Sequence, residues 1–224
     1  MFLQTLADDP LFFCGVAVTV VFSIVLHELA HGWVALWEGD DTPRATGHMT
    51  PNPIVHMGVL SIIMLLTCGI AFGAMPVNPA RFRHRYGDAL VAAAGPAMNL
   101  VLALAALTAT ALWIRAAGFR TEIRNDFAAN AQRFVLDFGV VNLALVILNL
   151  LPIPPLDGSV VLANLHGGYR DFLRRIHNPQ MFLIALLVIL VVASRADLGL
   201  FDLAREASLV YVNLLSGTPL EVVR

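Results

Sequence analysis

The sequence predicts an all-α polytopic membrane protein. The chain of 224 residues is 58% hydrophobic and only 13% charged, with a mean hydropathy of +0.76, far more apolar than a typical soluble domain. Its apolar residues gather in runs that approach or exceed the roughly 20 residues a helix needs to cross a bilayer. No hydrophilic stretch is long enough for a separate soluble domain, so we expect a single membrane domain over residues 1–224. A net charge of −2 gives no reason to expect a nucleic-acid partner.

Three strong apolar runs predict the core helices, over about residues 11–37, 89–114 and 138–157. Two weaker runs near the C-terminus predict helices over about 176–194 and 198–215. The last run contains several charged residues, which suits an amphipathic helix at the membrane interface better than a span. We therefore expect about four to six transmembrane helices.

The region 45–79 separates the first two core helices and holds a further apolar run, Ile54 to Met75. Glycines interrupt this run at Gly58, Gly69 and Gly73. Irregular backbone at membrane depth is tolerated where it is buried in protein or lines a water-filled cavity. The sequence therefore predicts a re-entrant loop or β-hairpin here, with a full crossing as the open alternative.

The first core helix carries an HExxH motif, His27-Glu28-Leu29-Ala30-His31. Positions four apart lie on the same face of a helix, so both imidazoles can bind one Zn²⁺. Glu28 lies one residue further round, where it can act on a water held by the metal. The motif therefore predicts metal-dependent hydrolysis at membrane depth.

A catalytic zinc usually takes three protein ligands and leaves one position open, so a third ligand is needed. Asp157 is the strongest candidate because a carboxylate at the end of an apolar span is costly without a partner. The prolines that precede it leave backbone carbonyls without donors, which is tolerated beside a cavity. An Asp before a glycine is also common in turns, and that alternative is weaker once HExxH is present. The other candidates are His48, His56, His84, His166 and His177.

Three motifs in this order resemble the site-2 protease family of intramembrane zinc metalloproteases. They are His27–His31, the segment Ala94-Gly95-Pro96-Ala97-Met98-Asn99, and the segment from Asn149 to Gly158 with its Leu-Asp-Gly ending. The resemblance covers about residues 11–168 and is closest to small bacterial members without PDZ or CBS domains. The stretch 75–79 resembles a loop of those members, whereas 52–58 matches only in part.

The resemblance implies a role for each matched residue. His27, His31 and Asp157 would bind one zinc ion per chain, and Glu28 would serve as general base and acid. Asn149 and Asn99 would hold polar groups of the substrate or of the active site. Both asparagines could equally form hydrogen bonds between helices. Gly95-Pro96 has an equally simple interpretation as a helix kink with close packing.

The site also predicts the topology, because both histidines and Asp157 lie late in their segments. For them to meet at one metal, the first and third core helices must run parallel, with 89–114 as the one crossing between them. The region 54–75 should then return to the side that it entered from. With the first helix running inward, seven arginines are cytoplasmic against four external ones, which favours a multi-pass protein of the cell membrane with its active site toward the cytoplasm. The seven are Arg44, Arg81, Arg83, Arg85, Arg170, Arg174 and Arg175.

By this resemblance the protein cleaves peptide bonds within or near transmembrane segments, in regulated intramembrane proteolysis. Its partners would be the bilayer and a single-span substrate such as an anti-sigma factor or a signal-peptide remnant, with a homo-oligomer left open. A helix hides its peptide bonds, so the substrate should dock as an extended strand, against an edge that we expect within residues 46–54.

Two alternatives remain at this stage. One is a zinc-binding membrane chaperone, transporter or regulator that cleaves nothing, and such a protein would have no need to keep Glu28. The other is a membrane zinc protease of the prenyl-protein-processing type, which would take its third ligand from a later helical Glu. Glu28 argues against the first alternative, and Asp157 argues against the second because the acidic candidates after the motif point to it as the third ligand.

Overall fold

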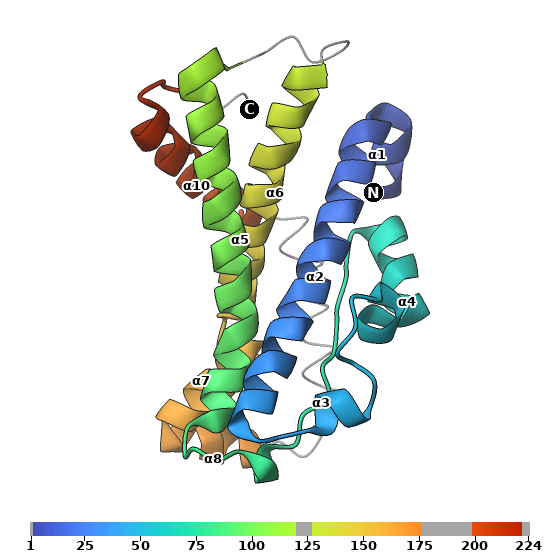
Figure 1. The fold of residues 1–224 in the computed structure, drawn as a ribbon, viewed down its shortest axis with the longest axis vertical. Coiled ribbons are helices and arrows are strands. Elements are labelled where there is room, and N and C mark those ends of the chain that lie inside the picture. The colour runs from blue at the N-terminus through green and yellow to red at the C-terminus, as the bar shows by residue number, and fades with distance from the viewer. Residues whose placement is uncertain (1, 120–126, 176–198, 221–224) are drawn as a thin grey trace.

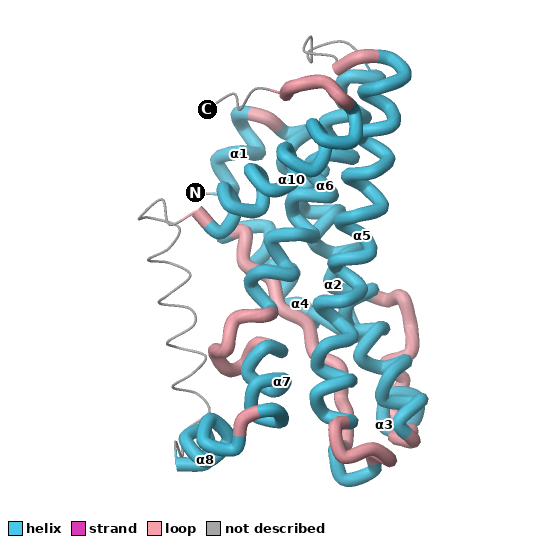
Figure 2. Tube along the Cα trace, turned by 90° about the vertical axis from the view of Figure 1, so that its left-hand side faces the viewer, coloured by secondary structure: helices cyan, strands magenta, loops and turns pink. Residues whose placement is uncertain are grey.

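The computed structural model describes residues 2–119, 127–175 and 199–220, and these residues form helices joined by loops, without a β-strand (Figure 2). The predicted all-α class is confirmed. The helices are α1 (Phe2–Asp8), α2 (Pro10–Glu38), α3 (Thr42–Ala45), α4 (Pro53–Cys68), η1 (Pro79–Arg81), α5 (Gly87–Ala117), α6 (Phe127–Asn149), α7 (Asp157–Leu165), α8 (Gly167–Arg175) and α10 (Leu200–Ser216).

Three of the described helices are long and apolar enough to cross a membrane: α2 with 29 residues, α5 with 31 and α6 with 23. They pack against one another in a single bundle (Figure 1). The predicted helix over 176–194 lies outside the described residues. The helix predicted over 198–215 is α10, which packs against α5 and α6 and contributes Val212 to a core cluster with Leu107 and Ile114.

The third core helix differs from the prediction of 138–157. It begins earlier, at Phe127, and ends at Asn149, after which residues 150–156 form turns and Asp157 starts a separate helix. The prolines in this stretch explain the early end, because each removes a backbone donor and clashes with a continuing helix. Its first turns make polar contacts, in which Arg133 pairs with Asp9 of the α1–α2 junction and with Asp137.

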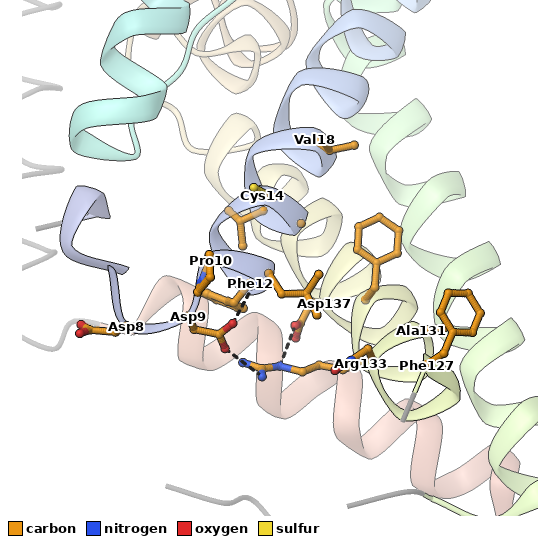
Figure 3. A pocket seen from close by; sticks show the side chains of 15 residues that line it. Asp8, Asp9, Pro10, Phe12, Cys14, Val18, Phe127, Ala131, Arg133 and Asp137 are labelled. Atoms are coloured by element: carbon orange, nitrogen blue, oxygen red, sulfur yellow. Dashed lines mark hydrogen bonds and ion pairs between the residues drawn. The ribbon is translucent and has the colours of Figure 1, made fainter. Parts of the chain in front are cut away.

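These ion pairs border a cavity of 790 Å³ between the first turns of α2 and of α6 (Figure 3). The Arg133 guanidinium lies 3.2 Å from Asp9 and 3.5 Å from Asp137, and its carbon lies 5.1 Å from the centre of the Phe12 ring. The rest of the lining is mainly apolar. The cluster ties the start of α2 to α6, far along α2 from the histidines of the HExxH motif.

The region between α2 and α5 turns back on itself, as the prediction of a re-entrant loop expects. Helix α4 is kinked at Gly58, whose φ of 67° is left-handed, and it ends at Gly69, with a φ of 75°. The chain then runs back as an extended segment over residues 70–78, from α4 to the end of α2 (Figure 1). The Asn78 amide donates to the Asp40 carboxylate at 2.6 Å, so the region begins and ends beside the same turn. It is a helix followed by one extended segment and not a β-hairpin.

Two buried carboxylates close this region at the end of α2. Glu38 accepts from the backbone amide and the imidazole of His84, and Asp40 accepts from Thr42 and Asn78. Burial by itself raises the pKa of Asp40, but these hydrogen bonds and the nearby Arg81 guanidinium together lower it below its usual value. The turn therefore holds a charged carboxylate that fixes the path of the chain into η1.

Candidate metal centre

The two histidines of the motif meet Asp157 in the interior of the protein. His27 and His31 lie on the inner face of α2, one turn apart, and both are buried. Their Nε2 atoms lie 3.0 Å and 3.5 Å from Asp157 Oδ2. One ligand atom from each of the three residues falls within 4.8 Å of the others. The structure thus brings together the three residues that the sequence proposes as metal ligands.

Hydrogen bonds from α5 orient both imidazoles. Asn99 donates its amide N–H to Asn142, which leaves its carbonyl oxygen as the acceptor for His27 Nδ1–H at 2.5 Å. His31 Nδ1–H donates to the Val91 carbonyl at 2.6 Å. Both rings therefore carry their proton on Nδ1 and point the lone pair of Nε2 at Asp157. This arrangement is typical of histidines that bind a metal.

The donor set fits a zinc ion. Asp157 Oδ2 is buried and has no hydrogen-bond donor among the described residues, because the two Nε2 atoms that face it carry lone pairs. Three acceptors pointing at one another repel unless a cation lies between them. Two imidazoles and one carboxylate form a common ligand set for catalytic zinc, which keeps a further position for water or substrate.

Close approach at Gly95 explains the glycine of the second motif. A Cβ atom at this position would overlap the imidazoles of His27 and His31. Helix α5 can therefore approach the metal ligands only because this residue has no side chain. Pro96 lies within α5, where it is buried. The sequence suggested that Gly95-Pro96 forms a helix kink with close packing. The structure adds that the site itself requires a glycine at position 95.

Glu28 lies on the same helix between the two histidines and is buried. The extended segment passes directly over it, since a Cβ atom at Gly73 would come within 2.5 Å of Glu28 Oε1 and 2.8 Å of Ile24. Glu28 thus lies between the metal ligands of its own helix and the backbone of residues 70–78.

The turns before Asp157 set its position. A Cβ atom at Gly158 would overlap the Leu150 carbonyl, so the start of α7 packs tightly against the end of α6. The Pro154–Pro155 peptide bond is cis. Tyr169 Oη donates to the Pro152 carbonyl at 2.9 Å, which anchors the turn to α8.

A cavity of 390 Å³ opens on the three ligands and is lined by α2, the extended segment, α5, α6 and α7. Asn149 lies at its wall, half-buried, with its amide donating to the Leu145 carbonyl. Asn99 is fully buried, and both ends of its amide are engaged by His27 and Asn142. In this structure Asn99 orients His27 and forms an interhelical hydrogen bond with Asn142, and its contact with the substrate stays a prediction.

Sequence reasoning missed three residues of this site. Asn142 supports Asn99, Ser61 holds the extended segment, and Gly73 makes room for Glu28. A polar residue in an apolar span is a signal for Asn142, which lies seven residues before Asn149 and so on the same face of α6. Ser61 and Gly73 carry no such signal, because serines and glycines are common in membrane helices and loops.

Comparison with known proteins agrees with this geometry. The sequence pattern of peptidase family M50 matches residues 15–135, which include the HExxH motif and Asn99. This chain belongs to peptidase family M50. The family comprises the site-2 proteases, so the predicted membership is confirmed. Asp157 lies beyond the matched residues, and only the folded structure brings it to the M50 motif.

Curated relatives carry the same assignment. The "Putative zinc metalloprotease YwhC" of Bacillus subtilis is 36% identical over 150 residues, which make up 66% of this chain and 67% of that protein. The "Putative zinc metalloprotease Rip2" of Mycolicibacterium smegmatis is 33% identical over 66% of this chain and 58% of its own length. The "Putative zinc metalloprotease Rip2" of Mycobacterium tuberculosis is 31% identical over 69% of this chain and 60% of its own length. No solved structure matches the chain significantly.

The M50 assignment and these names identify the chain as a zinc metalloprotease. The long apolar helices of the structure also make it a membrane protein. The chain spans less than two thirds of the Rip2 proteins, so what those proteins act on is not transferred to it.

Proposed function

We propose that this chain is an intramembrane endopeptidase that cleaves membrane proteins within or near their transmembrane segments. It would use one zinc ion per chain, held by His27, His31 and Asp157. The observation that carries the proposal is the meeting of these three ligands inside a bundle of helices long enough to span a bilayer. A soluble substrate would have no reason to reach a site built at this depth.

The chemistry is divided between the metal and the protein. When bound, zinc would supply a Lewis acid that lowers the pKa of water and polarises a peptide carbonyl. The Glu28 carboxylate accepts a proton from the attacking water and passes it to the nitrogen of the leaving amine. Asn99 and Val91 hold the imidazoles with their Nε2 lone pairs directed at the metal position.

The extended segment 70–78 offers an edge for the substrate. Ser61 Oγ donates to the Phe72 carbonyl at 2.7 Å and accepts from its amide at 2.9 Å, and the Ala74 amide donates to the His56 carbonyl. Alternate residues of an extended chain present their backbone groups to opposite sides. The backbone groups of Gly73 and Met75 therefore face away from α4, and neither forms a hydrogen bond within the described residues.

We infer that an unwound stretch of substrate docks on this edge as a strand, with main-chain hydrogen bonds to Gly73 and Met75. The edge lies beside Glu28 and lines the cavity that contains the ligands. The segment 46–54, where the sequence suggested such an edge, instead forms turns and the first residues of α4. Gly or Pro in a substrate helix would ease its unwinding.

We also propose that the protein lies in the cell membrane with its active site toward the cytoplasm and takes part in regulated intramembrane proteolysis. Its substrates would be single-span proteins such as an anti-sigma factor or a signal-peptide remnant. The distribution of arginines supports this orientation under the positive-inside rule. Helices α3 and α8, η1 and the start of α5, which carry or adjoin all seven of the arginines assigned to the cytoplasm, gather at one end of the bundle (Figure 1).

Co-expression with a single-span membrane substrate that carries a tag at each end tests the proposal. The native chain should release two tagged fragments, and Glu28→Gln should release none. Glu206→Gln, which removes an exposed carboxylate on α10, is the matched control and should cleave normally. Fragments that persist with Glu28→Gln would reject the mechanism. An absence of fragments with the native chain would instead favour a zinc-binding chaperone, transporter or regulator that cleaves nothing.

A further inference from the structure

Helix α8, Gly167–Arg175, is amphipathic. At about 100° per residue, Tyr169, Phe172 and Leu173 fall on one face, and the charged residues fall on the other. The charged face carries three arginines and one aspartate, namely Arg170, Arg174, Arg175 and Asp171. A short basic helix of this pattern is typical of a segment that lies in a membrane interface.

The apolar face of α8 is not used in the protein core. No residue of α8 is buried, and Phe172 is 56% exposed. Figures 1 and 2 both place α8 at the lower end of the bundle, near the level of α3, and its packing within the described residues is against α7. An exposed phenylalanine beside the ends of membrane-spanning helices has a natural partner in lipid.

Helix α8 is also attached to the metal centre at two points. It follows directly after α7, a nine-residue helix whose first residue is Asp157. In addition, Tyr169 Oη donates to the Pro152 carbonyl, five residues before Asp157. The turn that positions Asp157 is therefore contacted by Tyr169 of α8, and Asp157 itself begins the helix that leads into α8.

We propose that α8 is a lipid-binding helix that engages anionic phospholipid headgroups and thereby stabilises the position of Asp157. Phe172 enters the acyl boundary, and the guanidinium groups of Arg170 and Arg174 bind phosphate oxygens. The excess of arginine over aspartate favours headgroups with net negative charge over zwitterionic ones. The effect on catalysis rests on the proposed function, whereas the lipid contact itself does not.

Lipid retention tests the surface directly. The full chain is reconstituted in nanodiscs of phosphatidylcholine and phosphatidylglycerol, and native mass spectrometry counts the phospholipids that stay bound. The double variant Arg170→Gln/Arg174→Gln should retain phosphatidylglycerol at least about fivefold more weakly. Arg44→Gln/Arg115→Gln, with the same loss of charge away from α8, should retain it as the native chain does. Equal retention by the two double variants would overturn the proposal.

Crosslinking identifies what covers the apolar face. With a photoreactive phenylalanine analogue at position 172, the proposal expects adducts to phospholipid. Adducts to another part of this chain, or to a second copy, would overturn it.

Tyr169→Phe tests the link to Asp157, because it removes only the hydroxyl that reaches Pro152. Lipid retention should be unchanged. In the native chain, phosphatidylglycerol should slow hydrogen exchange over residues 150–158 and raise the rate of proteolysis, and both effects should be lost in Tyr169→Phe. If no chain cleaves a substrate in any lipid, the proposed function fails, while retention and exchange still decide the lipid contact. Slowed exchange that persists in Tyr169→Phe would overturn the link.

Discussion

Gly73 lies so close over Glu28 that a Cβ atom at Gly73 would come within 2.5 Å of the Glu28 carboxylate. The contact joins the extended segment to the proposed general base, across 45 residues of sequence. A change in the path of residues 70–78 at Gly73 would therefore shift the Glu28 carboxylate.

Gly73→Ala should therefore lower kcat by at least about tenfold, because the added methyl group displaces Glu28 or the segment by enough to misalign the proton transfer. Zinc content, measured on the purified chain, should be unchanged, since no metal ligand moves. Gly167→Ala is the control, because a Cβ atom there meets nothing closer than 3.7 Å. Normal kcat in Gly73→Ala would show that the segment is free to move away.

Asn99→Ala should weaken zinc binding by about 10- to 100-fold, the usual effect of removing a partner that orients a metal-binding histidine. The substitution leaves His27 Nδ1–H without its acceptor and frees the ring to turn. Competition with a chelator measures the change. Asn149→Ala, at the cavity wall, should instead raise KM and leave zinc affinity intact. Equal zinc affinity in the two variants would contradict the assigned roles.

Zinc should raise the Tm of the native chain and have little effect on Asp157→Asn. In the metal-free native chain, three acceptors face one another, and a bound cation removes that repulsion. In the variant, an amide N–H can donate to one of the imidazoles. The repulsion in the metal-free form is therefore reduced without zinc. Stabilisation by a ligand at about 100 times its Kd is about 2.7 kcal/mol, which thermal unfolding in detergent detects readily. Equal zinc-induced shifts in the two chains would place the metal elsewhere.

Asp40→Asn should destabilise the protein at neutral pH by about 1–3 kcal/mol, since the turn loses a charged acceptor for the Thr42 and Asn78 amides. The pKa of Asp40 is lower in the folded protein than in the unfolded chain, where it is about 3.9. Its contribution is therefore complete above that value and is lost as the pH falls through the lower, folded pKa. The stability difference between native and variant chains, measured by denaturant unfolding, should hold from pH 6 to 8 and shrink below about pH 4. A difference that does not change with pH would show that the carboxylate charge is not what holds the turn.

Much of the fold and the ligand set of the site could be predicted from sequence, because the apolar runs and the motifs are local signals. The apolar runs predicted the positions of α2 and α5 to within about three residues, since the cost of exposing backbone in a bilayer leaves helices as the natural choice. The ends of α6 were harder to place. Its first turns carry polar residues such as Arg133, whose partner Asp9 lies 124 residues earlier in the chain.

The amino-acid sequence by itself determined that His27 and His31 share one helix face with Glu28 beside them, because the α-helical repeat sets that relation within five residues. Only the tertiary structure decided that Asp157 lies against both histidines and that Gly95 leaves room for both rings. It also decided that Asn99 orients His27, and that residues 70–78 rather than 46–54 pass beside Glu28. The physical reason is common to all four. Each depends on packing between segments that are distant in sequence, and a local motif can name a residue but does not fix its distance to a residue of another segment.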